Sequence, residues 1–368
     1  MKITIVLGAF FPVPPLMGGA VEKVWFALGQ EFVRQGHSVV QVSRAHPALP
    51  VAETIAGVRH VRVRGSSQPR SIVWLKWLDL LYSIRAFFAL PKADIVVTNT
   101  FWLPILLRNS RRGKIYVHVA RFPKGQMRFY RHADRLQTVS TSVAEAIRRE
   151  VPTMENKISV VPNPLPGSMF AKSPKSPTNR AKLLLYVGRI HPEKGVHLLI
   201  EALAVLAEDW KAAIVGSADS GLGGGGVDYL AQLKEAARKL RCEVSWQGPI
   251  FDEAALAEQY RSARLFVYAS LAERGETFGL APLESMANGC PVLVSNLACF
   301  RDFVRPNETG FVFDHRANSP VTALATKLAA VLADDATLVS VAAAGLRESK
   351  NFAVENVGRK YLNDFQLT

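Results

Sequence analysis

Hydrophobic and polar positions alternate along the chain in two different rhythms. Short apolar runs, typical of strands buried in a parallel sheet, are separated by longer segments that have the spacing of amphipathic helices. This alternation of strand and helix predicts a sheet covered by helices on both faces. In the first half of the chain the predicted strands are 2–8, 38–43, 58–64, 93–99, 114–119 and 157–163, and the predicted helices are 21–35, 71–92 and 142–150.

The pattern stops at residues 164–180, which are rich in proline and serine, and a second series of strands and helices then begins. A chain of 368 residues is too long for one comfortable core, so we predict two α/β domains, each a doubly wound parallel sheet. Their predicted bounds are 1–168 and 182–350, with a linker at 169–181 and a closing helical segment at 351–368. In the second domain the predicted strands are 182–189, 211–216, 244–248, 264–270 and 290–295, and the predicted helices include 196–208 and 229–240.

Two features bear on the compartment in which the chain works. Lys2, followed by an apolar run and small residues, fits a secretory signal peptide. Prolines break that run, however, and a buried first strand followed by a helix explains the same residues, so we favour the strand. The cysteines, Cys242, Cys290 and Cys299, form neither a C-x-x-C pair nor an even framework, which predicts reduced packing residues in a cytoplasmic protein.

The net charge of +14 lies entirely in the first part of the chain. Residues 1–170 hold 23 Lys and Arg against 9 Asp and Glu, whereas residues 171–368 hold 22 of each kind. A one-sided basic surface suggests an anionic partner such as an acidic membrane face or a phosphorylated lipid carrier. The alternative is that the arginines lie on solvent-exposed helix faces and only keep the protein soluble. Only the charge suggests nucleic acid, since the chain has no helix-turn-helix, zinc or RNP pattern, and we predict no nucleic-acid partner.

The segment 71–92 is a long apolar helix candidate in the first domain. It carries Trp74, Trp77, Phe87 and Phe88, and it is interrupted too often by charged residues to be read as a membrane span. We expect a core helix. The alternative is an interfacial helix that places its aromatic side chains in a bilayer surface.

The clearest chemistry lies in residues 273–292. Two carboxylates, Glu276 and Glu284, flank a glycine-containing turn at 277–279 that leads into a helix, and the start of that helix would leave main-chain N–H groups pointing at a bound phosphate. If the whole segment rose at helical pitch, the two carboxyls would lie about 12 Å apart, enough to flank a diphosphate and bond sugar hydroxyls. The alternative is that both are solvated charges near a helix start, where carboxylates are favoured.

This segment resembles the E-x7-E signature of the retaining, nucleotide-sugar-dependent glycosyltransferases of family four, which have the GT-B fold. The resemblance covers nearly the whole chain and implies two Rossmann-like domains facing across a cleft, an acceptor-binding one first and a nucleotide-sugar-binding one second, with the last helix crossing back to the first. It implies that Glu276 contacts the donor sugar and that Glu284 binds the nucleotide ribose. It also implies that Arg189 and Lys194, between a strand and a helix, hold the donor diphosphate and stabilise charge on the departing nucleotide.

The resemblance carries over further positions. His118, at the end of a predicted strand, matches a histidine of the acceptor-side cleft near the donor sugar, although a lone histidine on a strand is often structural. Asn163 matches a turn of the PNG type, but Pro164 stands where the glycine is usual and puts any contact in doubt. The implied catalytic residues are Glu276, Arg189, Lys194 and His118. The implied donor-binding residues are Gly18, Gly19, Arg189, Lys194, Gly248, Pro249, Ile250, Glu276, Thr277, Phe278, Gly279, Leu280 and Glu284.

The expected activity is transfer of a sugar from a UDP, GDP or ADP sugar to a hydroxyl acceptor with retained configuration, the acceptor being a glycan or a lipid-linked glycan of the bacterial envelope. No cofactor is expected, and no metal, since the chain has no D-x-D pair for Mg²⁺ and two cations can neutralise the diphosphate instead. The absence of a G-x-G-x-x-G run after the first strand argues against a nicotinamide enzyme. The alternatives are another GT-B enzyme such as a sugar-nucleotide epimerase, or a non-catalytic protein that binds nucleotide sugars or anionic lipids. We expect the protein in the cytoplasm, with the inner face of the membrane as a possible site of work.

Overall fold

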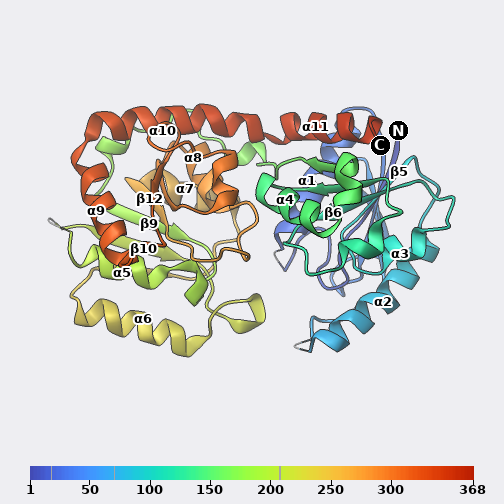
Figure 1. The fold of residues 1–368 in the computed structure, drawn as a ribbon, viewed down its shortest axis with the longest axis horizontal. Coiled ribbons are helices and arrows are strands. Elements are labelled where there is room, and N and C mark those ends of the chain that lie inside the picture. Colours follow the sequence, from blue (N-terminus) through green and yellow to red (C-terminus); the bar gives the residue numbers. More distant parts are fainter. Residues whose placement is uncertain (18, 70, 207–208) are drawn as a thin grey trace. The chain divides into compact units, whose positions relative to one another are not determined.

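The chain forms two compact units (Figure 1). A computed structural model describes residues 1–17, 19–69, 71–206 and 209–368. Unit 1 comprises Met1–Pro164 together with Val354–Thr368, and unit 2 comprises Leu165–Ala353. Each unit is built on its own sheet of mainly parallel strands, which confirms the predicted fold class.

Unit 1 contains an eight-stranded sheet in the order β3-β4-β2-β1-β5-β6-β7-β8. Neighbouring strands are parallel except for β3 and β4, which pair antiparallel at one edge. The six strands predicted from apolar runs are present, and β3 and β7 are additional. The strands are β1 (Lys2–Val6), β2 (Ser38–Arg44), β3 (Ala52–Ile55), β4 (Val58–Val63), β5 (Ile95–Thr98), β6 (Lys114–Val119), β7 (Arg135–Thr138) and β8 (Ile158–Val160).

Strand β7 escaped prediction because its sequence, RLQT, contains no apolar run. The structure instead gives its polar side chains partners inside unit 1. The Gln137 amide donates hydrogen bonds to the carbonyls of Thr138 and Val161, and Arg135 forms an ion pair with Asp364 at 3.2 Å. A buried polar strand is stable when its polar groups are paired in this way.

The helices of unit 1 pack on both faces of its sheet. The final helix, α11 (Val354–Gln366), buries Val357, Tyr361 and Phe365 along one side, at the spacing of an amphipathic helix. Tyr361 lies 5.1 Å from the ring of Trp25 in α1, so the end of the chain is part of the core of unit 1. The other helices are α1 (Ala20–Arg34), α2 (Ile72–Ala89), α3 (Leu103–Leu107) and α4 (Thr141–Glu150).

The prediction that residues 71–92 form a core helix is wrong in one respect. The helix is present as α2, but its buried residues are Asp79, Tyr82, Ser83 and Ala86, and half of its large apolar side chains are exposed. In Figure 1, α2 lies at the margin of unit 1. The apolar composition of this segment therefore does not predict which of its side chains are buried.

Unit 2 contains a six-stranded parallel sheet in the order β11-β10-β9-β12-β13-β14. From β9 the chain first builds toward one edge, through β10 and β11, and then returns to add β12 on the other side. This reversal is the kind of switch point at which ligands bind to open parallel sheets. The strands are β9 (Leu183–Val187), β10 (Lys211–Val215), β11 (Val244–Gln247), β12 (Leu265–Tyr268), β13 (Val292–Ser295) and β14 (Phe311–Phe313).

The helices of unit 2 connect these strands. The predicted helix at 196–208 is shorter in the structure, ending at Leu203, and its predicted last residues, 207 and 208, lie outside the described residues. The helices are α5 (Val196–Leu203), α6 (Val227–Lys239), α7 (Glu253–Ser262), α8 (Leu280–Ala287), α9 (Pro320–Ala333) and α10 (Asp335–Ser349).

The segment 169–181, predicted as a linker, packs as part of unit 2. Arg180 is buried, and its guanidinium donates hydrogen bonds to the carbonyls of Tyr260, Ala263 and Gly289. The serines and prolines that suggested a linker instead shape the short turns around this anchor. One buried cation satisfied by carbonyls explains how a polar segment can be fixed in place.

Among the described residues, no single helix has the length and apolarity needed to cross a membrane. The pair formed by Pro320–Ala333 and Asp335–Phe352, bent by 97° at the break, passes the test by length and composition alone.

Candidate functional site

The first half of the site follows strand β9 in unit 2. After Val187 the chain turns through Arg189 and a short 3₁₀ helix, Pro192–Lys194, before α5 begins. Gly195 joins the two helices with φ of 68°, and a Cβ at this position would lie 1.9 Å from the carbonyl oxygen of Ala269. Only glycine fits this close approach, which brings the turn after β9 against the end of β12.

The second half follows strand β12, the neighbour of β9 in the sheet. The loop from Ala269 to Gly279 carries Glu276 and leads into α8. Main-chain contacts tie this loop to the first one, since the Leu271 N–H donates to the carbonyl of Glu193 at 2.7 Å. Two loops from the carboxyl ends of adjacent strands thus meet at the switch point of the sheet.

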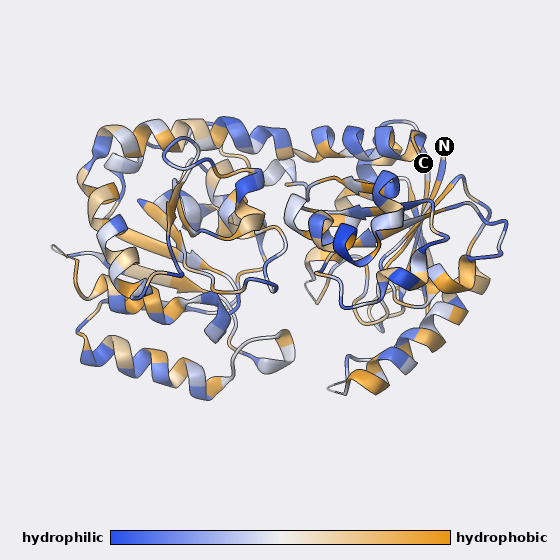
Figure 2. Ribbon diagram, in the orientation of Figure 1, coloured by the Kyte–Doolittle hydropathy of each residue, from blue (hydrophilic) through white to orange (hydrophobic). Residues whose placement is uncertain are grey.

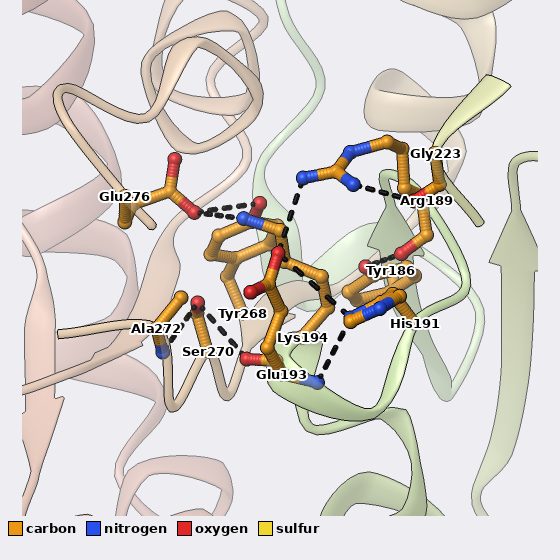
Figure 3. Close-up of polar contacts among 10 residues, drawn as sticks. All are labelled: Tyr186, Arg189, His191, Glu193, Lys194, Gly223, Tyr268, Ser270, Ala272 and Glu276. Atoms are coloured by element: carbon orange, nitrogen blue, oxygen red, sulfur yellow. Dashed lines mark hydrogen bonds and ion pairs between the residues drawn. The ribbon is translucent and has the colours of Figure 1, made fainter. Parts of the chain in front are cut away.

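Lys194 and Glu276 meet where these loops converge (Figure 3). The Lys194 Nζ lies 2.7 Å from Oε2 of Glu276, and the hydroxyl of Tyr268 donates to the same oxygen at 3.0 Å. The two charged side chains are 5% and 11% exposed, so their attraction is weakly screened by water. Within the described residues no hydrogen bond reaches Oε1 of Glu276, which leaves that oxygen able to accept one from a ligand.

Tyr268 is held in place by stacked aromatic rings. Its ring stacks on Tyr186 with centroids 5.6 Å apart and on Phe266 at 6.0 Å. Burial, reinforced by the nearby charge of Glu276, holds the pKa of Tyr268 well above its ordinary value. The hydroxyl therefore stays protonated and acts as a fixed donor to Glu276.

Arg189 lies in the same turn but points elsewhere. Its guanidinium donates to the carbonyl of Gly223 and forms an ion pair with Glu193 at 3.2 Å (Figure 3). The hydroxyl of Tyr186 donates to the Arg189 carbonyl at 2.8 Å and fixes the main chain. With its side chain about half exposed, Arg189 is a second cation on the turn that carries Lys194.

The second glutamate of the signature, Glu284, lies in the middle of α8. The buried hydroxyl of Tyr260, from α7, donates to its Oε2 at 2.8 Å. Because α8 begins only at Leu280, the segment from Glu276 does not rise at helical pitch throughout, and the premise of the 12 Å estimate does not hold. Each glutamate of the signature is instead positioned by its own tyrosine.

The start of α8 has the form expected of an anion-binding turn. Gly279 precedes the helix with φ of 91°, and a Cβ there would lie 2.5 Å from the ring of Phe300. No side chain caps the helix, so its first N–H groups remain for another acceptor. Thr277 and Leu280 are half-buried on either side, whereas the ring of Phe278 packs into the core against Phe303, which restricts any donor contact of Phe278 to its main chain.

In unit 1, His118 is buried in β6 and makes contacts within the unit. Its Nδ1 lies 2.6 Å from Oε1 of Gln137, and its ring meets Trp25 edge-on at 5.3 Å. The Gln137 amide nitrogen already donates to two carbonyls, so its oxygen must accept and His118 Nδ1 carries the hydrogen. Burial lowers the pKa of His118 to about 4, and the ring is neutral near pH 7.

The glycine turn after β1 contains an acid that the sequence analysis did not single out. Gly18 lies outside the described residues. Gly19 caps α1 with φ of 95°, and a Cβ there would lie 2.2 Å from Oε2 of Glu22. Burial raises the pKa of the Glu22 carboxyl, a shift that the charge of Arg121 partly opposes. The small size of Gly19 thus makes room for a carboxylate at this turn.

Two family models match the chain. One, described as Glycosyltransferase Family 4, matches residues 17–166, and the other, described as Glycosyl transferases group 1, matches residues 169–347. The chain belongs to the family-4-like glycosyltransferases. Its structure has the two parallel-sheet, Rossmann-like domains of the GT-B type.

Relatives of this glycosyltransferase include a lipopolysaccharide core biosynthesis mannosyltransferase, LpsB, of Rhizobium meliloti (strain 1021), which is 32% identical over 47% of this chain and 48% of LpsB. The chain spans about half the length of the first curated relatives it matches. Among solved structures, sucrose-phosphate synthase from Thermosynechococcus elongatus has a TM-score of 0.81 at 20% identity, covering 100% of this chain and 98% of that one. Anabaena Alr3699/HepE in complex with UDP-glucose has a TM-score of 0.75 at 18% identity, with 100% of both chains covered.

The glycosyltransferase site also contains residues that the motifs did not reveal. Tyr268, in an apolar strand, and Tyr260, in a mixed helix, follow from no motif, and only the fold shows that the hydroxyl of each reaches a signature glutamate. The glycines at 223–226 belong to no motif, yet they contact the turn after β9. In the structure the carbonyl of Gly223 accepts a hydrogen bond from the Arg189 guanidinium, and the N–H of Gly225 donates to the carbonyl of Ile190.

The predicted donor-binding residues 248–250 lie apart from the cluster around Lys194 and Glu276. Gly248, Pro249 and Ile250 form the loop after β11, the edge strand, two places along the sheet from β9. Gly248 and Pro249 are exposed, so this loop is open to a ligand rather than packed against the Lys194 turn. Over the described part of the chain, no group of three His, Cys, Asp or Glu side chains is placed to hold a metal ion.

Proposed function

We propose that this glycosyltransferase moves a sugar from a UDP, GDP or ADP sugar to a hydroxyl acceptor with retention of configuration. The observation that carries the proposal is the contact of Lys194, Glu276 and Tyr268 at the switch point of unit 2. There a cation, a carboxylate and a neutral donor lie beside the uncapped start of α8, and these are the groups a sugar diphosphate needs. The solved neighbours bound to UDP or UDP-glucose support a nucleotide-sugar donor.

The ion pair of Lys194 and Glu276 suggests how the donor enters. In the unliganded site each of these groups satisfies the other. A sugar diphosphate can replace both partners at once, because its phosphate oxygens accept from Lys194 and a sugar hydroxyl donates to Glu276. Donor binding thereby replaces the ion pair of Lys194 and Glu276 with contacts from each of them to the donor. Neither Lys194 nor Glu276 is left unpaired in the complex.

The chemical step follows from the same arrangement. The bond between the anomeric carbon and the diphosphate oxygen breaks as the acceptor oxygen bonds to that carbon on the same face, and the acceptor hydroxyl passes its proton to the leaving phosphate. Lys194 and Arg189 stabilise the negative charge that grows on the diphosphate, so the reaction requires no metal and no covalent nucleophile from the protein. Glu284, oriented by Tyr260, binds the ribose. The family resemblance further assigns donor contacts to Gly19 and the loop at 248–250, and a place near the donor sugar to His118.

For the acceptor we propose a glycan or lipid-linked glycan of the bacterial envelope, bound by unit 1 at the cytoplasmic side of the membrane. The excess of cations in residues 1–170 supports an acceptor that carries negative charge. The likeness to LpsB, named as a lipopolysaccharide core mannosyltransferase, supports an envelope glycan.

The proposal is tested first by the melting temperature of the protein with UDP, GDP, ADP and their sugars, because a ligand of the folded state raises it. Release of the nucleotide is then measured with and without envelope glycan acceptors. We expect one nucleotide class to stabilise the protein and acceptor to accelerate its release. Stabilisation without acceptor-dependent release would support a binding protein instead, and conversion of the donor sugar without transfer would support an epimerase.

A further inference from the structure

The outward face of α2 is apolar, as the buried face of a helix normally is. Trp77, Leu81, Ile84 and Phe88 follow one another at intervals of four, three and four residues, so they form a single stripe along the helix. The opposite side, which faces unit 1, buries Asp79 and Ser83 together with Tyr82 and Ala86. Amphipathic helices normally turn the apolar stripe toward the core. In α2 only Tyr82 among the large apolar side chains is fully buried on the inward side, and the stripe lies on the outer side.

Three of the four stripe residues are exposed, as is Trp74 about one turn before the stripe, whereas Leu81 is half-buried. Trp74 is 61% exposed, Trp77 52% and Phe88 76%, and the apolar colour along α2 is visible in Figure 2. Near the end of the helix, Ile84 and Phe88 contribute to a hollow of about 230 Å³ whose lining residues are all apolar. Scattered exposed apolar residues are ordinary, but several exposed aromatic and aliphatic side chains gathered on one helix mark an interaction surface.

The buried side of α2 explains why the helix keeps this orientation. The Asp79 carboxylate accepts hydrogen bonds from the main-chain N–H groups of Phe101 and Trp102, at 3.1 and 3.2 Å, at the start of α3. Turning the apolar stripe inward would expose Asp79 and leave those N–H groups unpaired, at a cost of roughly 1–3 kcal/mol for each buried group. The aromatic stripe is therefore held outward by specific bonds.

The charges around the stripe all have one sign. Lys76 and Arg85 are the exposed charged residues of α2, and its one acid, Asp79, is buried. The Lys76 Nζ lies 4.8 Å above the ring of Phe101, so this cation remains close to aromatic surface. Arg112 likewise lies over Phe87. Residues 1–170 have a net charge of +14, so the part of the chain that carries the stripe is basic overall.

We propose that the exposed face of α2 docks unit 1 onto a lipid bilayer that contains anionic lipids. Tryptophan and phenylalanine side chains partition into the boundary between head groups and acyl chains, and flanking Lys and Arg side chains bind anionic head groups at about 1 kcal/mol each. A second copy of this chain is a poorer partner, because the same basic charges would face each other across the contact. This inference does not depend on the sugar-transfer reaction, since binding to lipid can be measured without donor or acceptor.

The test is co-sedimentation of the full chain with vesicles of phosphatidylcholine, alone or with about one third phosphatidylglycerol. We expect binding to the anionic vesicles that falls as salt rises, and at least about tenfold weaker binding by the double variant Trp77→Glu, Phe88→Glu. Phe251→Glu is the matched control, because Phe251 is an equally exposed aromatic residue of unit 2, at 61%. Equal binding by the wild type and the double variant, or no binding by the wild type, would overturn the proposal.

A second readout shows which face enters the bilayer without adding charge. Brominated lipids should quench part of the tryptophan fluorescence of the bound wild type, and Trp74→Phe, Trp77→Phe should lose that quenching while still binding. Sedimentation velocity without lipid covers the alternative occupant. A dimer that the Trp77→Glu, Phe88→Glu variant abolishes would assign the face to a second copy of the chain and reject the bilayer.

Discussion

Each of the two units is built on its own open, mainly parallel sheet. The polar side chains near the ends of the strands have different partners in the two units. In unit 2, Lys194 and Glu276 come from different loops and are each other's partners, so a ligand can separate them by offering a substitute for each. In unit 1, His118 is fixed by a glutamine of its own sheet, and burial keeps it neutral. The difference teaches that the same topology can place an exchangeable charged pair after its strands, as with Lys194 and Glu276, or a fixed neutral contact, as with His118.

The largest effect should come from removing the cation of the unit 2 pair. Lys194→Met should lower turnover by about 10² to 10³-fold with a smaller change in the Michaelis constant, because the charge that Lys194 stabilises grows in the transition state. Arg189→Ala should show the same pattern with a smaller loss, since its side chain is about half exposed. The measurement is steady-state kinetics with the donor found by the melting screen.

The matched control for this prediction is Lys211→Met. Lys211 also pairs with a glutamate, Glu243, at 2.6 Å, but both side chains are more than half exposed at the other end of the sheet. Turnover should be unchanged in this variant. If both lysine variants lost activity equally, the special role of the Lys194 contact would be disproved.

A smaller effect is expected at the second glutamate of the signature. A charged hydrogen bond from Glu284 to the ribose is worth roughly 1.5 to 3 kcal/mol, so Glu284→Ala should weaken donor binding by about one to two orders of magnitude. Tyr260→Phe removes only the hydroxyl that orients Glu284 and should weaken binding less. Calorimetric titration gives both values, and an unchanged affinity of Glu284→Ala would remove the ribose assignment.

The last effect concerns His118, acts on stability rather than on activity, and appears only in acid. Its pKa is about 4 in the folded chain against an ordinary value of 6.5, so the unfolded chain binds more protons between these values. Stability that is complete above pH 6.5 is therefore lost as pH falls toward 4, by up to about 3 kcal/mol from this group.

His118→Gln should make the fall of the urea midpoint between pH 6.5 and 4 shallower. Burial raises the pKa of Asp79 to about 6, so the contribution of Asp79 to stability increases as pH falls. The effect of His118 is therefore taken from the difference between the wild type and the variant. An NMR titration in which the His118 ring takes up a proton near pH 6.5 would contradict the contrast between the two units.

The sequence predicts six strands of unit 1 and β9 to β13 of unit 2 from their apolar runs, but it misses the short strand β14. It identifies Glu276 and Lys194 because spacing and a family resemblance mark both, but not that they touch, which depends on the order of β9 and β12 in the sheet. Tyr268 and Tyr260 are missed because nothing in the residues around them distinguishes either from an ordinary core tyrosine. The outward turn of α2 is missed because composition does not reveal that Asp79 bonds the start of α3.

The most direct test of the exchangeable pair is the binding of the bare nucleoside diphosphate and of its sugar to Glu276→Gln, measured by calorimetry beside Glu258→Gln, an exposed glutamate of α7, as control. The account predicts that Glu276→Gln binds the bare nucleotide at least as tightly as the wild type, because the carboxylate that competes for Lys194 is gone, while turnover of the nucleotide sugar falls by about 10²-fold or more. Weaker binding of the bare nucleotide by Glu276→Gln, or unchanged turnover, would contradict it.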